Sequence, residues 1–425
     1  MEYKVVDGKG VIPDGATDVG EGAFKNCIGL QSVVIPDSVT KIWSSAFSGC
    51  ASLKTIEIPN SVTSIGYSAF EGCSSLQSIV IPDSVTAIEG YAFKNCTNLQ
   101  SIVIPDTVTC VSVQSFFGCT KLQSIDIPNS VLRIERNAFD SCTGLQSIDI
   151  PSTVTKIEDC AFIWCKSLKT IELPNSVTEI GSGAFFDCTG LQSIIIPDRV
   201  TLIGAYAFSG CTKLQSIDIP DSVTLIGEGA FTVCANLTSI TVSKNNPAYE
   251  SDNNCILTKD GKTLLLCGSH CVPNSVTTIG KGAFREDKSI QSIVIPNSVT
   301  KIDDGAFSDC TSLQSIVIPD GVTTIGTRAF IRCDNLQSIE IPDSVTLIGI
   351  DVFRDCRSLQ SITITTKNKV PCLAHENIEH LLRSISKDLD NLEISLRVPI
   401  SCDDAYRHYP AFEGKFKRII ADIDA

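Results

Sequence analysis

The sequence predicts a solenoid of tandem repeats, a fold in which short extended segments stack turn upon turn around one elongated core. Three observations lead to this prediction. A 23-residue pattern recurs along most of the chain, apolar residues occupy fixed slots in each copy, and a column of cysteines shares the same period. Because a stack of repeats grows by adding turns, the length of 425 residues does not by itself imply several globular domains.

Phenylalanine marks the period most clearly. Successive repeated phenylalanines lie 23 residues apart in the sequence, except that 53 residues separate Phe231 from Phe284. We therefore expect about fourteen repeats, with one insertion in the longer step. The repeated phenylalanines are Phe24, Phe47, Phe70, Phe93, Phe116, Phe139, Phe162, Phe185, Phe208, Phe231, Phe284, Phe307, Phe330 and Phe353.

Each copy contains two short extended segments and a turn. In the copy that begins at Leu99, the apolar residues Leu99, Ile102 and Ile104 point inward as in a strand. Pro105 ends this strand because proline cannot donate to a ladder, and the Asp or Asn that follows favours a turn. A Val-Thr-x-Ile segment predicts a second extended piece. Ala-Phe-x-x-Cys then places Phe and Cys on one side of a helical or 3₁₀ turn.

The string Ile-Pro-x-x-Val-x-x-Ile-x-x-x-Ala-Phe-x-x-Cys resembles the leucine-rich repeats of the BspA-like class, over roughly residues 10–365. The resemblance implies a curved right-handed superhelix with a parallel β-sheet on its concave face, and short strands and 3₁₀ or helical turns elsewhere. Members are commonly surface or secreted proteins of anaerobic bacteria and some parasitic protists. The resemblance thus implies a protein-binding or adhesion module at the cell surface, with a protein or host-matrix ligand as its partner.

The repeats and the C-terminal segment predict two domains, a solenoid over 1–365 and a cap over 366–425. The cap pattern indicates a helix at 376–387, a strand at 392–398, a short helix at 403–408 and a strand near 416–420. Such a cap would cover the apolar edge of the last turn. The first turn shows little capping, which leaves the oligomeric state open.

The insertion, near residues 243–272, contains an expected β-hairpin over 255–267 with Asp260-Gly261 at its tight turn. It is either a protruding binding finger or an insertion tolerated at the solenoid edge. Three cysteines and one histidine of the insertion leave two alternatives open, a disulfide across the hairpin or a metal site. Structural zinc sites usually contain two pairs of closely spaced cysteines. The four residues are Cys255, Cys267, His270 and Cys271.

Most cysteines belong to one column. Cysteine at a fixed core slot behaves as a small apolar residue. Stacked turns hold Cβ atoms about 4.8 Å apart, beyond the usual disulfide distance, so we expect free thiols. The column consists of Cys27, Cys50, Cys73, Cys96, Cys119, Cys142, Cys165, Cys188, Cys211, Cys234, Cys310, Cys333 and Cys356.

Charge excludes some classes of partner. The net charge is −14, and the 34 basic residues form no cluster of the kind that binds nucleic acid or anionic membranes. No run of 18 apolar residues occurs, so a membrane span is not expected. Residues 1–8 carry no apolar segment typical of a secretory signal. An intracellular scaffold in the cytoplasm therefore stays open beside the surface adhesion module.

Nothing in the sequence indicates catalysis. The chain has four histidines, and His375 and His380 lie five residues apart, whereas the zinc-protease helix requires four. No phosphate loop, nucleophile elbow or dinucleotide fingerprint occurs. We predict no enzyme activity, no cofactor and no metal ligand. Other departures from the repeat, at Trp43, 110–112, Cys160 and Asp287, are interpreted as variation without chemical roles.

The outward positions of the Leu-x-x-Ile-x-Ile segments form three columns. The first is mostly Gln, the second is Ser or Thr, and the third varies, so the third is where specificity for a ligand can reside. Asp126, Asp149 and Glu172 occupy successive turns and form an acidic strip, which is either part of a ligand surface or ordinary solvated charge. The predicted ligand-binding residues are Glu57, Asp126, Asp149, Glu172 and Asp218.

Overall fold

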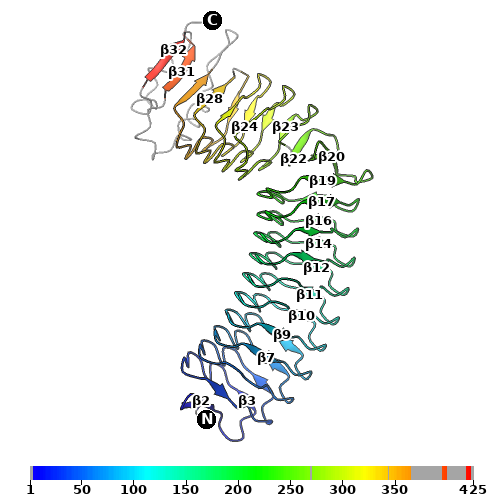
Figure 1. Ribbon diagram of the computed structural model, residues 1–425, viewed down its shortest axis with the longest axis vertical. Coiled ribbons are helices and arrows are strands. Elements are labelled where there is room, and N and C mark those ends of the chain that lie inside the picture. The colour runs from blue at the N-terminus through cyan, green and yellow to red at the C-terminus, as the bar shows by residue number, and fades with distance from the viewer. Residues whose placement is uncertain (1–2, 269, 343, 365–394, 400–417, 423–425) are drawn as a thin grey trace. The chain divides into compact units, whose positions relative to one another are not determined.

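The computed structural model describes residues 3–268, 270–342, 344–364, 395–399 and 418–422. The chain divides into two compact units, unit 1 (Met1–Leu237) and unit 2 (Thr238–Ala425). In each unit successive turns stack as short parallel strands, and the described residues contain no helix (Figure 1). The predicted repeat solenoid is therefore confirmed, whereas the predicted division at residue 365 stays a prediction.

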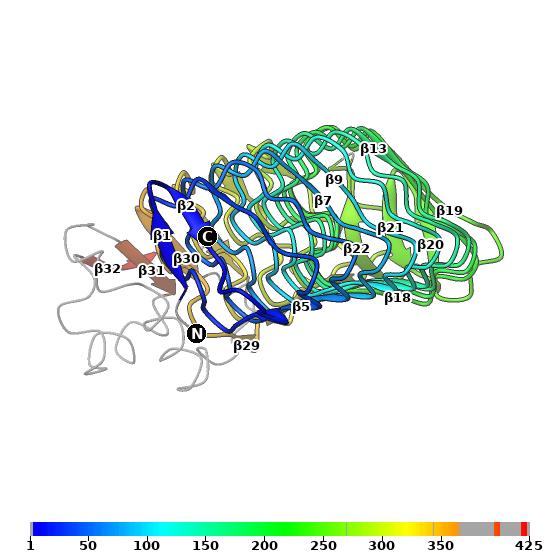
Figure 2. The same ribbon diagram turned by 90° about the horizontal axis from the view of Figure 1, so that it is seen from below.

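Unit 1 contains two sets of strands from the two extended segments of each repeat, which lie on different sides of the coil (Figure 2). The Leu-x-x-Ile-x-Ile set follows an N-terminal hairpin and is completed by isolated parallel bridges. The hairpin and this set are β1 (Lys4–Val6), β2 (Lys9–Val11), β4 (Ser32–Val33), β7 (Ser78–Val80), β9 (Ser101–Val103), β13 (Thr170–Ile171), β15 (Ser193–Ile194) and β17 (Ser216–Ile219). The Val-Thr-x-Ile set is β3 (Asp18–Val19), β5 (Lys41–Ile42), β6 (Ser64–Ile65), β8 (Ala87–Ile88), β10 (Cys110–Val111), β11 (Arg133–Ile134), β12 (Lys156–Ile157), β14 (Glu179–Ile180), β16 (Leu202–Ile203) and β18 (Leu225–Ile226).

Unit 2 repeats this arrangement around the insertion. Its Leu-x-x-Ile-x-Ile strands are β19 (Ser239–Val242), β24 (Ser292–Ile293), β26 (Ser315–Ile316), β28 (Ser338–Ile341) and β30 (Ser361–Ile364). Its Val-Thr-x-Ile strands are β23 (Thr278–Ile279), β25 (Lys301–Ile302), β27 (Thr324–Ile325) and β29 (Leu347–Ile348). The insertion contributes β20 (Tyr249–Asp252), β21 (Cys255–Thr258) and β22 (Thr263–Cys267).

Stacked phenylalanine rings form the centre of the core. In unit 1 the rings from Phe24 to Phe231 lie 5.3–5.6 Å apart between centroids, with planes within 8° of parallel. In unit 2 the rings from Phe284 to Phe353 are 5.1–5.8 Å apart. Each ring is almost fully buried. Burial of one such side chain stabilises the fold by about 1.5–3 kcal/mol, so the column is a principal source of cohesion.

The turn that carries phenylalanine and cysteine is a series of single turns. Lys25 N donates to Gly22 O (3.0 Å) within the same turn, whereas Phe24 N donates to Ala46 O (2.7 Å) of the next turn. Gly22 (φ 61°) and Asn26 (φ 60°) adopt the left-handed conformation. A left-handed residue interrupts a right-handed helix, so the expected i→i+3 bonds form but do not continue into a helix.

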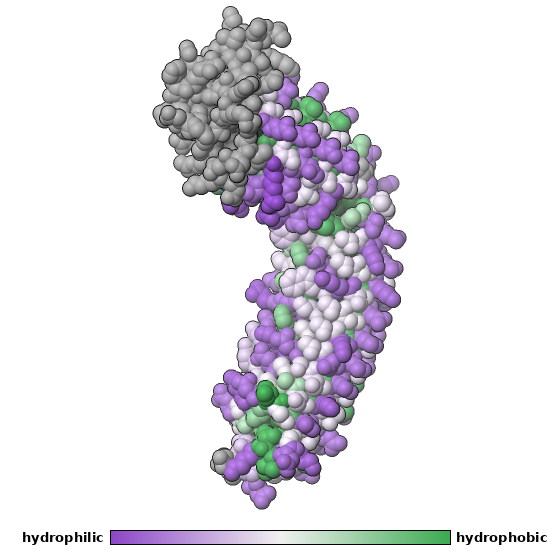
Figure 3. Space-filling model, turned by 60° about the vertical axis from the view of Figure 1, so that its left-hand side comes forward, coloured by the Kyte–Doolittle hydropathy of each residue, from purple (hydrophilic) through white to green (hydrophobic). Residues whose placement is uncertain are grey.

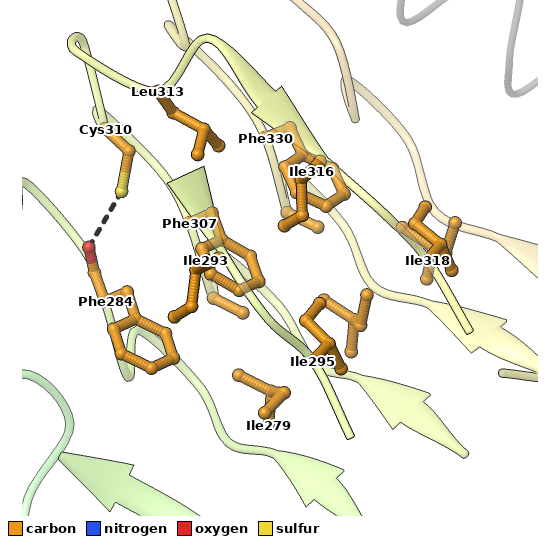
Figure 4. Close-up of a cluster of buried hydrophobic side chains, with 14 of the residues drawn as sticks. Ile279, Phe284, Ile293, Ile295, Phe307, Cys310, Leu313, Ile316, Ile318 and Phe330 are labelled. Carbon is orange, nitrogen blue, oxygen red and sulfur yellow. Dashed lines mark hydrogen bonds between the residues drawn. The ribbon is translucent and has the colours of Figure 1, made fainter. Parts of the chain in front are cut away.

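Two kinds of side-chain hydrogen bond link neighbouring turns. Ser130 Oγ donates to Val108 O (2.6 Å), and the same bond recurs along the Ser/Thr column. Twelve cysteine thiols among the described residues donate to the phenylalanine carbonyl of the preceding turn, at 2.9–3.2 Å. Figure 4 shows this bond between Cys310 and Phe284. The serine that sequence reasoning assigned to the turn thus joins neighbouring turns.

The N-terminal end of unit 1 is capped, which corrects the expectation of little capping. β1 pairs antiparallel with β2, and β2 continues in parallel to β4. Tyr3 packs edge-on against Phe24, with ring centroids 5.5 Å apart. The Tyr3 hydroxyl donates to Asp18 O (3.0 Å) and accepts from Gly20 N (3.1 Å). The ring therefore covers the end of the phenylalanine column, and an antiparallel strand replaces an open parallel edge.

Two strands follow the last regular turn of unit 2. β31 (Ser395–Pro399) pairs in parallel with β30, and β32 (Arg418–Asp422) pairs in parallel with β31. They confirm a strand close to each place where one was expected, near 392–398 and 416–420. The helices expected at 376–387 and 403–408 lie outside the described residues. That residues 366–425 act as a cap stays a prediction.

Candidate functional site

The outward side of the Leu-x-x-Ile-x-Ile strands in unit 1 is the candidate site, and we call it the strand face. The first column, such as Gln77 and Gln100, and the second column, such as Ser78 and Ser101, are exposed as predicted. Inward residues of the same strands, such as Ile79, are buried. The alternation holds the outward side chains in fixed rows because parallel register aligns equivalent residues of successive turns.

The five predicted ligand-binding residues are all exposed in the third column of this face. Glu57 forms parallel bridges with Val34 and Val80 on its two neighbouring turns. Asp149 and Glu172 are directly bridged, so two carboxylates lie side by side on adjacent turns. Asp126 bridges to Val103, and Asp218 lies within β17. The structure thus places all five in one column, and their role in binding stays a prediction.

Aliphatic side chains share this column with the carboxylates. Val34 is 84% exposed, Val80 is 76%, Val103 is 60% and Ile195 is 79%. Val80 and Val103 are directly paired in the β7–β9 ladder. Figure 3 shows hydrophobic residues gathered in patches on a mainly hydrophilic or neutral surface, one of them near the N-terminal end. Several large aliphatic side chains at equivalent exposed positions mark a surface suited to contact another molecule.

The insertion of unit 2 is a hairpin, but it does not protrude. β20, β21 and β22 pair antiparallel in order, and Gly261 (φ 66°) lies at the predicted turn. β22 then pairs in parallel with β23 and so joins the Val-Thr-x-Ile sheet. Ile256, Leu257 and Leu264 are buried. The interpretation as a projecting finger is therefore wrong, because its apolar side chains belong to the core of unit 2.

Cys255 and Cys267 are joined in a disulfide and face each other across the β21–β22 ladder. Of the two alternatives for these residues, the structure therefore contains the disulfide, and neither sulfur is available as a thiolate ligand. All thirteen cysteines of the repeat column are free thiols, as expected. The pairing follows from antiparallel register, which brings cysteine Cβ atoms closer than parallel stacking does.

Sequence reasoning missed a pairing between His270 and Asp287. His270 Nε2 lies 2.7 Å from Asp287 Oδ2, and the other carboxylate oxygen accepts from Ser289 N (2.9 Å). Asp287 occupies a slot of the cysteine column, where a regular turn would place a thiol donor. Here the preceding segment is the insertion, which supplies a histidine instead of a phenylalanine carbonyl. Two features of the sequence could have revealed this pair. Asp287 replaces a cysteine of the column, and the insertion before it contains a histidine.

The pKa values of this pair move apart. The hydrogen bond to Asp287 raises the pKa of His270, against the opposing effect of burial. Burial acts to raise the pKa of Asp287, but hydrogen bonds from His270 and Ser289 outweigh it and lower this pKa. Both shifts favour the charged pair. We assign the pair to attachment of the insertion, because it connects the chain after β22 to the turn after Phe284.

Burial disfavours the thiolate form of core cysteines such as Cys119 and Cys142 at neutral pH. Burial raises the pKa of Cys119 to about 12 and the pKa of Cys142 well above its ordinary value. A thiol in this state holds its proton and stays a hydrogen-bond donor to the carbonyl beside it. Because nucleophilic chemistry needs the thiolate, the column serves packing.

Among the described residues, no helix is long and apolar enough to cross a membrane.

Comparisons with known proteins agree with this architecture. The sequence profile of the BspA type leucine rich repeat region matches residues 17–146, 133–255 and 269–381. A leucine-rich repeat protein from Bacteroides ovatus is 30% identical with a TM-score of 0.56, covering 89% of this chain and 86% of that chain. A leucine rich cell surface protein from Faecalibacterium prausnitzii is 26% identical with a TM-score of 0.50, covering 93% and 88%.

A third similar structure is the pneumococcal vaccine antigen PcpA, with 20% identity, a TM-score of 0.57 and coverage of 87% of this chain and 94% of that chain, which indicates a shared fold. No curated protein matches the sequence. The family profile covers most of the described turns in both units. The chain belongs to the family of BspA-type leucine-rich repeat proteins.

Proposed function

We propose that this protein is a binding and adhesion module of the cell surface that holds a protein or host-matrix ligand on the strand face of unit 1. The observation that carries the proposal is the third column, where exposed valines and carboxylates replace the uniform Gln and Ser/Thr of the neighbouring columns. A purely structural column would not need large exposed aliphatic side chains. In a binding surface, burial of such side chains against the partner removes apolar area from water, and charged side chains orient the partner.

The order of side chains along the column suggests how a ligand is oriented. Val80 and Val103 lie on adjacent turns, Asp126 follows, and Asp149 and Glu172 come next. A ligand surface with an apolar part beside basic groups would match this order. Lys or Arg of the partner would offset the repulsion between Asp149 and Glu172, which is unfavourable in the free protein.

Two observations support a location at the cell surface. The disulfide between Cys255 and Cys267 is of a kind that persists in oxidising compartments. A relative of similar length, 26% identical, is described as a cell surface protein. The alternative of a cytoplasmic scaffold would require this disulfide to be reduced in the cell. Mass spectrometry of the protein from its native source, alkylated before lysis, separates the two locations.

The binding experiment uses the full chain and immobilised fibronectin, fibrinogen, laminin and collagen. The test variant combines Asp126→Lys, Asp149→Lys and Glu172→Lys. The control combines Asp83→Lys, Asp106→Lys and Asp198→Lys, which make the same charge change at exposed turn positions outside the column. We expect saturable binding to at least one ligand, lost in the test variant and largely kept in the control.

Equal loss in both triple variants would mean that only net charge matters and would contradict a site on the strand face. Absence of binding to all four ligands by the folded wild-type protein would contradict the adhesion proposal. Circular dichroism and thermal unfolding of each variant establish that the fold is intact. Exposed substitutions of this kind usually change the unfolding free energy by about 0.5 kcal/mol or less.

A further inference from the structure

Three aromatic residues form a diagonal row on a different side of unit 1. Trp43 directly follows β5, Tyr67 comes two residues after β6, and Tyr91 comes three residues after β8. Each successive turn thus moves the aromatic residue one position along the same short segment. In the other turns of unit 1 these three positions carry mostly small or polar residues, with Tyr206 as an exception. We call Trp43, Tyr67 and Tyr91 the aromatic row.

Two residues of this row are exposed, and the third, Tyr91, is partly buried. Trp43 is 47% exposed and Tyr67 is 45% exposed, and the Tyr67 and Tyr91 rings lie 4.7 Å apart between centroids, inclined by 42°. Tyr91 adopts the left-handed conformation (φ 62°), at a slot where neighbouring turns place Ser45 and Ser68. A bulky residue is costly in this conformation, so the fold alone does not favour tyrosine here.

Polar groups lie along the rim of the row. Glu89 Oε2 accepts a hydrogen bond from the backbone N–H of Tyr67 (3.0 Å), which fixes this exposed carboxylate at the backbone of the row. The tyrosine hydroxyls and the indole N–H of Trp43 add donors and acceptors. The surface therefore combines flat apolar rings with hydrogen-bonding groups at their edges. A sugar ring has the complementary form, with C–H groups on its faces and hydroxyls around its rim.

Cations already lie over two of the rings. Lys41 Nζ is 5.4 Å from the centre of the Trp43 ring, and Lys94 Nζ is 4.9 Å from the centre of the Tyr91 ring. Lys94 also forms an ion pair with Glu71 at 3.5 Å. A cationic ligand such as a quaternary ammonium would be repelled by these lysines. The charge arrangement favours a neutral ligand, and the partial positive charge of sugar C–H groups suits the negative faces of the rings.

We infer that the aromatic row is a binding site for neutral glycans, separate from the strand face. Trp43 and Tyr67 stack against the apolar faces of linked sugar rings, and Glu89 accepts hydrogen bonds from their hydroxyls. The row crosses three turns, so it extends roughly 10 Å along the stack and accommodates a short oligosaccharide. A surface protein with both sites would hold a glycoprotein by its protein part and by its sugar.

The chain offers a direct optical test, because it has only two tryptophans, Trp43 and Trp164. Trp164 occupies a left-handed slot (φ 60°) that carries Gly49 and Gly72 in other turns, so Trp164→Gly fits the local backbone. The full chain with this substitution reports only from Trp43. It is titrated with neutral oligomers of N-acetylglucosamine, galactose and glucose, and in parallel with choline and with heparin oligosaccharides.

We expect at least one neutral oligosaccharide to shift Trp43 emission to shorter wavelength in a saturable manner. On this background Tyr67→Ser and Tyr91→Ser introduce residues that neighbouring turns already carry at the same slots. Each should weaken binding by up to about tenfold. Tyr206→Ser, outside the row, should leave the affinity unchanged. Calorimetry repeats the titration without relying on fluorescence.

Three results would overturn the inference. They are absence of binding to every neutral oligosaccharide of the panel, a response to choline or heparin alone, and neutral-sugar binding that persists in the Tyr67→Ser, Tyr91→Ser double variant. The charge-reversed variant of the strand face keeps the aromatic row intact. Sugar binding by that variant therefore tests this inference separately from the proposed adhesion function.

Discussion

The thiol of Cys142 donates a hydrogen bond to the backbone carbonyl of Phe116, 3.1 Å away on the preceding turn. Cys142 is fully buried and Phe116 is almost fully buried, so this hydrogen bond is shielded from solvent. The same bond recurs along both units and joins the cysteine column to the phenylalanine column. Four consequences of the structure can be measured.

Replacement of a column cysteine should destabilise the fold. Cys142→Ala removes the donor to Phe116 and leaves a small void, so we expect the free energy of unfolding to fall by about 1–2 kcal/mol. Cys27→Ala is the matched control, because Cys27 begins the column and is only partly buried. Urea unfolding of both variants gives the values. Equal losses would show that the hydrogen bond to the carbonyl contributes nothing.

Alkaline pH should unfold the protein steeply. Burial raises the pKa of Cys50 and of Cys119 to about 12, from an ordinary value near 9.0. The folded state therefore binds these protons more tightly, and its stability is full below pH 9 and falls as pH rises toward 12. Each such thiol costs up to about 1.4 kcal/mol per pH unit in that window. Chemical denaturation between pH 8 and about 11 measures the slope, which Cys119→Ala should reduce.

Attachment of the insertion should depend on pH through His270 and Asp287. The raised pKa of His270 gives stabilisation that is full below about pH 6.5 and lost as pH rises through the shifted value. The lowered pKa of Asp287 gives stabilisation that is present above about pH 4 and lost on acidification. The opening free energy of β22, obtained from amide exchange corrected for the intrinsic exchange rate at each pH, should therefore be largest between these limits.

A double-mutant cycle isolates this pair. His270→Asn suits the left-handed backbone at this position (φ 54°), and Asp287→Asn removes the carboxylate charge. Because both side chains are partly exposed, solvent screening limits the expected coupling to about 1 kcal/mol. A coupling of zero at pH 5.5, or an opening free energy of β22 that does not change with pH in the wild type, would contradict an ionic attachment.

The exposed valines of the strand face should matter for binding and not for folding. Val80→Thr and Val103→Thr keep β-branched side chains at 76% and 60% exposed positions, so the unfolding free energy should change by about 0.5 kcal/mol or less. Binding to a ligand found in the matrix screen should weaken. Val85→Thr, at a fully buried position, should instead destabilise the fold by about 1–3 kcal/mol.

The repeat pattern predicted the fold because each slot has one physical role in every copy. Phe139 and Leu145 recur at the same spacing in nearly every copy, with Ile290 in place of the leucine after Phe284, and both slots are buried as expected. The N-terminal cap was missed since Tyr3 lies outside any periodic slot, and its contact with Phe24 exists only once the first turn has formed.

The positions of the candidate site were predicted, but only its carboxylates were assigned a role. The column of Asp126, Asp149 and Glu172 followed from strand alternation, and the structure places all three on the exposed face. The same alternation places the valines of that column on the outward side, but they are ordinary strand residues in sequence, so only the carboxylates were proposed as ligand-binding residues. Trp43 was assigned no role, because a single substitution reveals nothing until the stacked turns show that Tyr67 and Tyr91 follow it on the next two turns.

The bonds between turns also determine how the length of this protein can change. Ser130 reaches back 22 residues, Thr63 reaches back 23 and Cys142 reaches back 26. Removal of one whole period within the regular part of unit 1 returns equivalent donors to equivalent acceptors, whereas any other excision leaves thiols and hydroxyls opposite the wrong slots. Gene duplication or loss can therefore lengthen or shorten the array only by whole turns, so its reach toward a partner evolves in increments of about 4.8 Å.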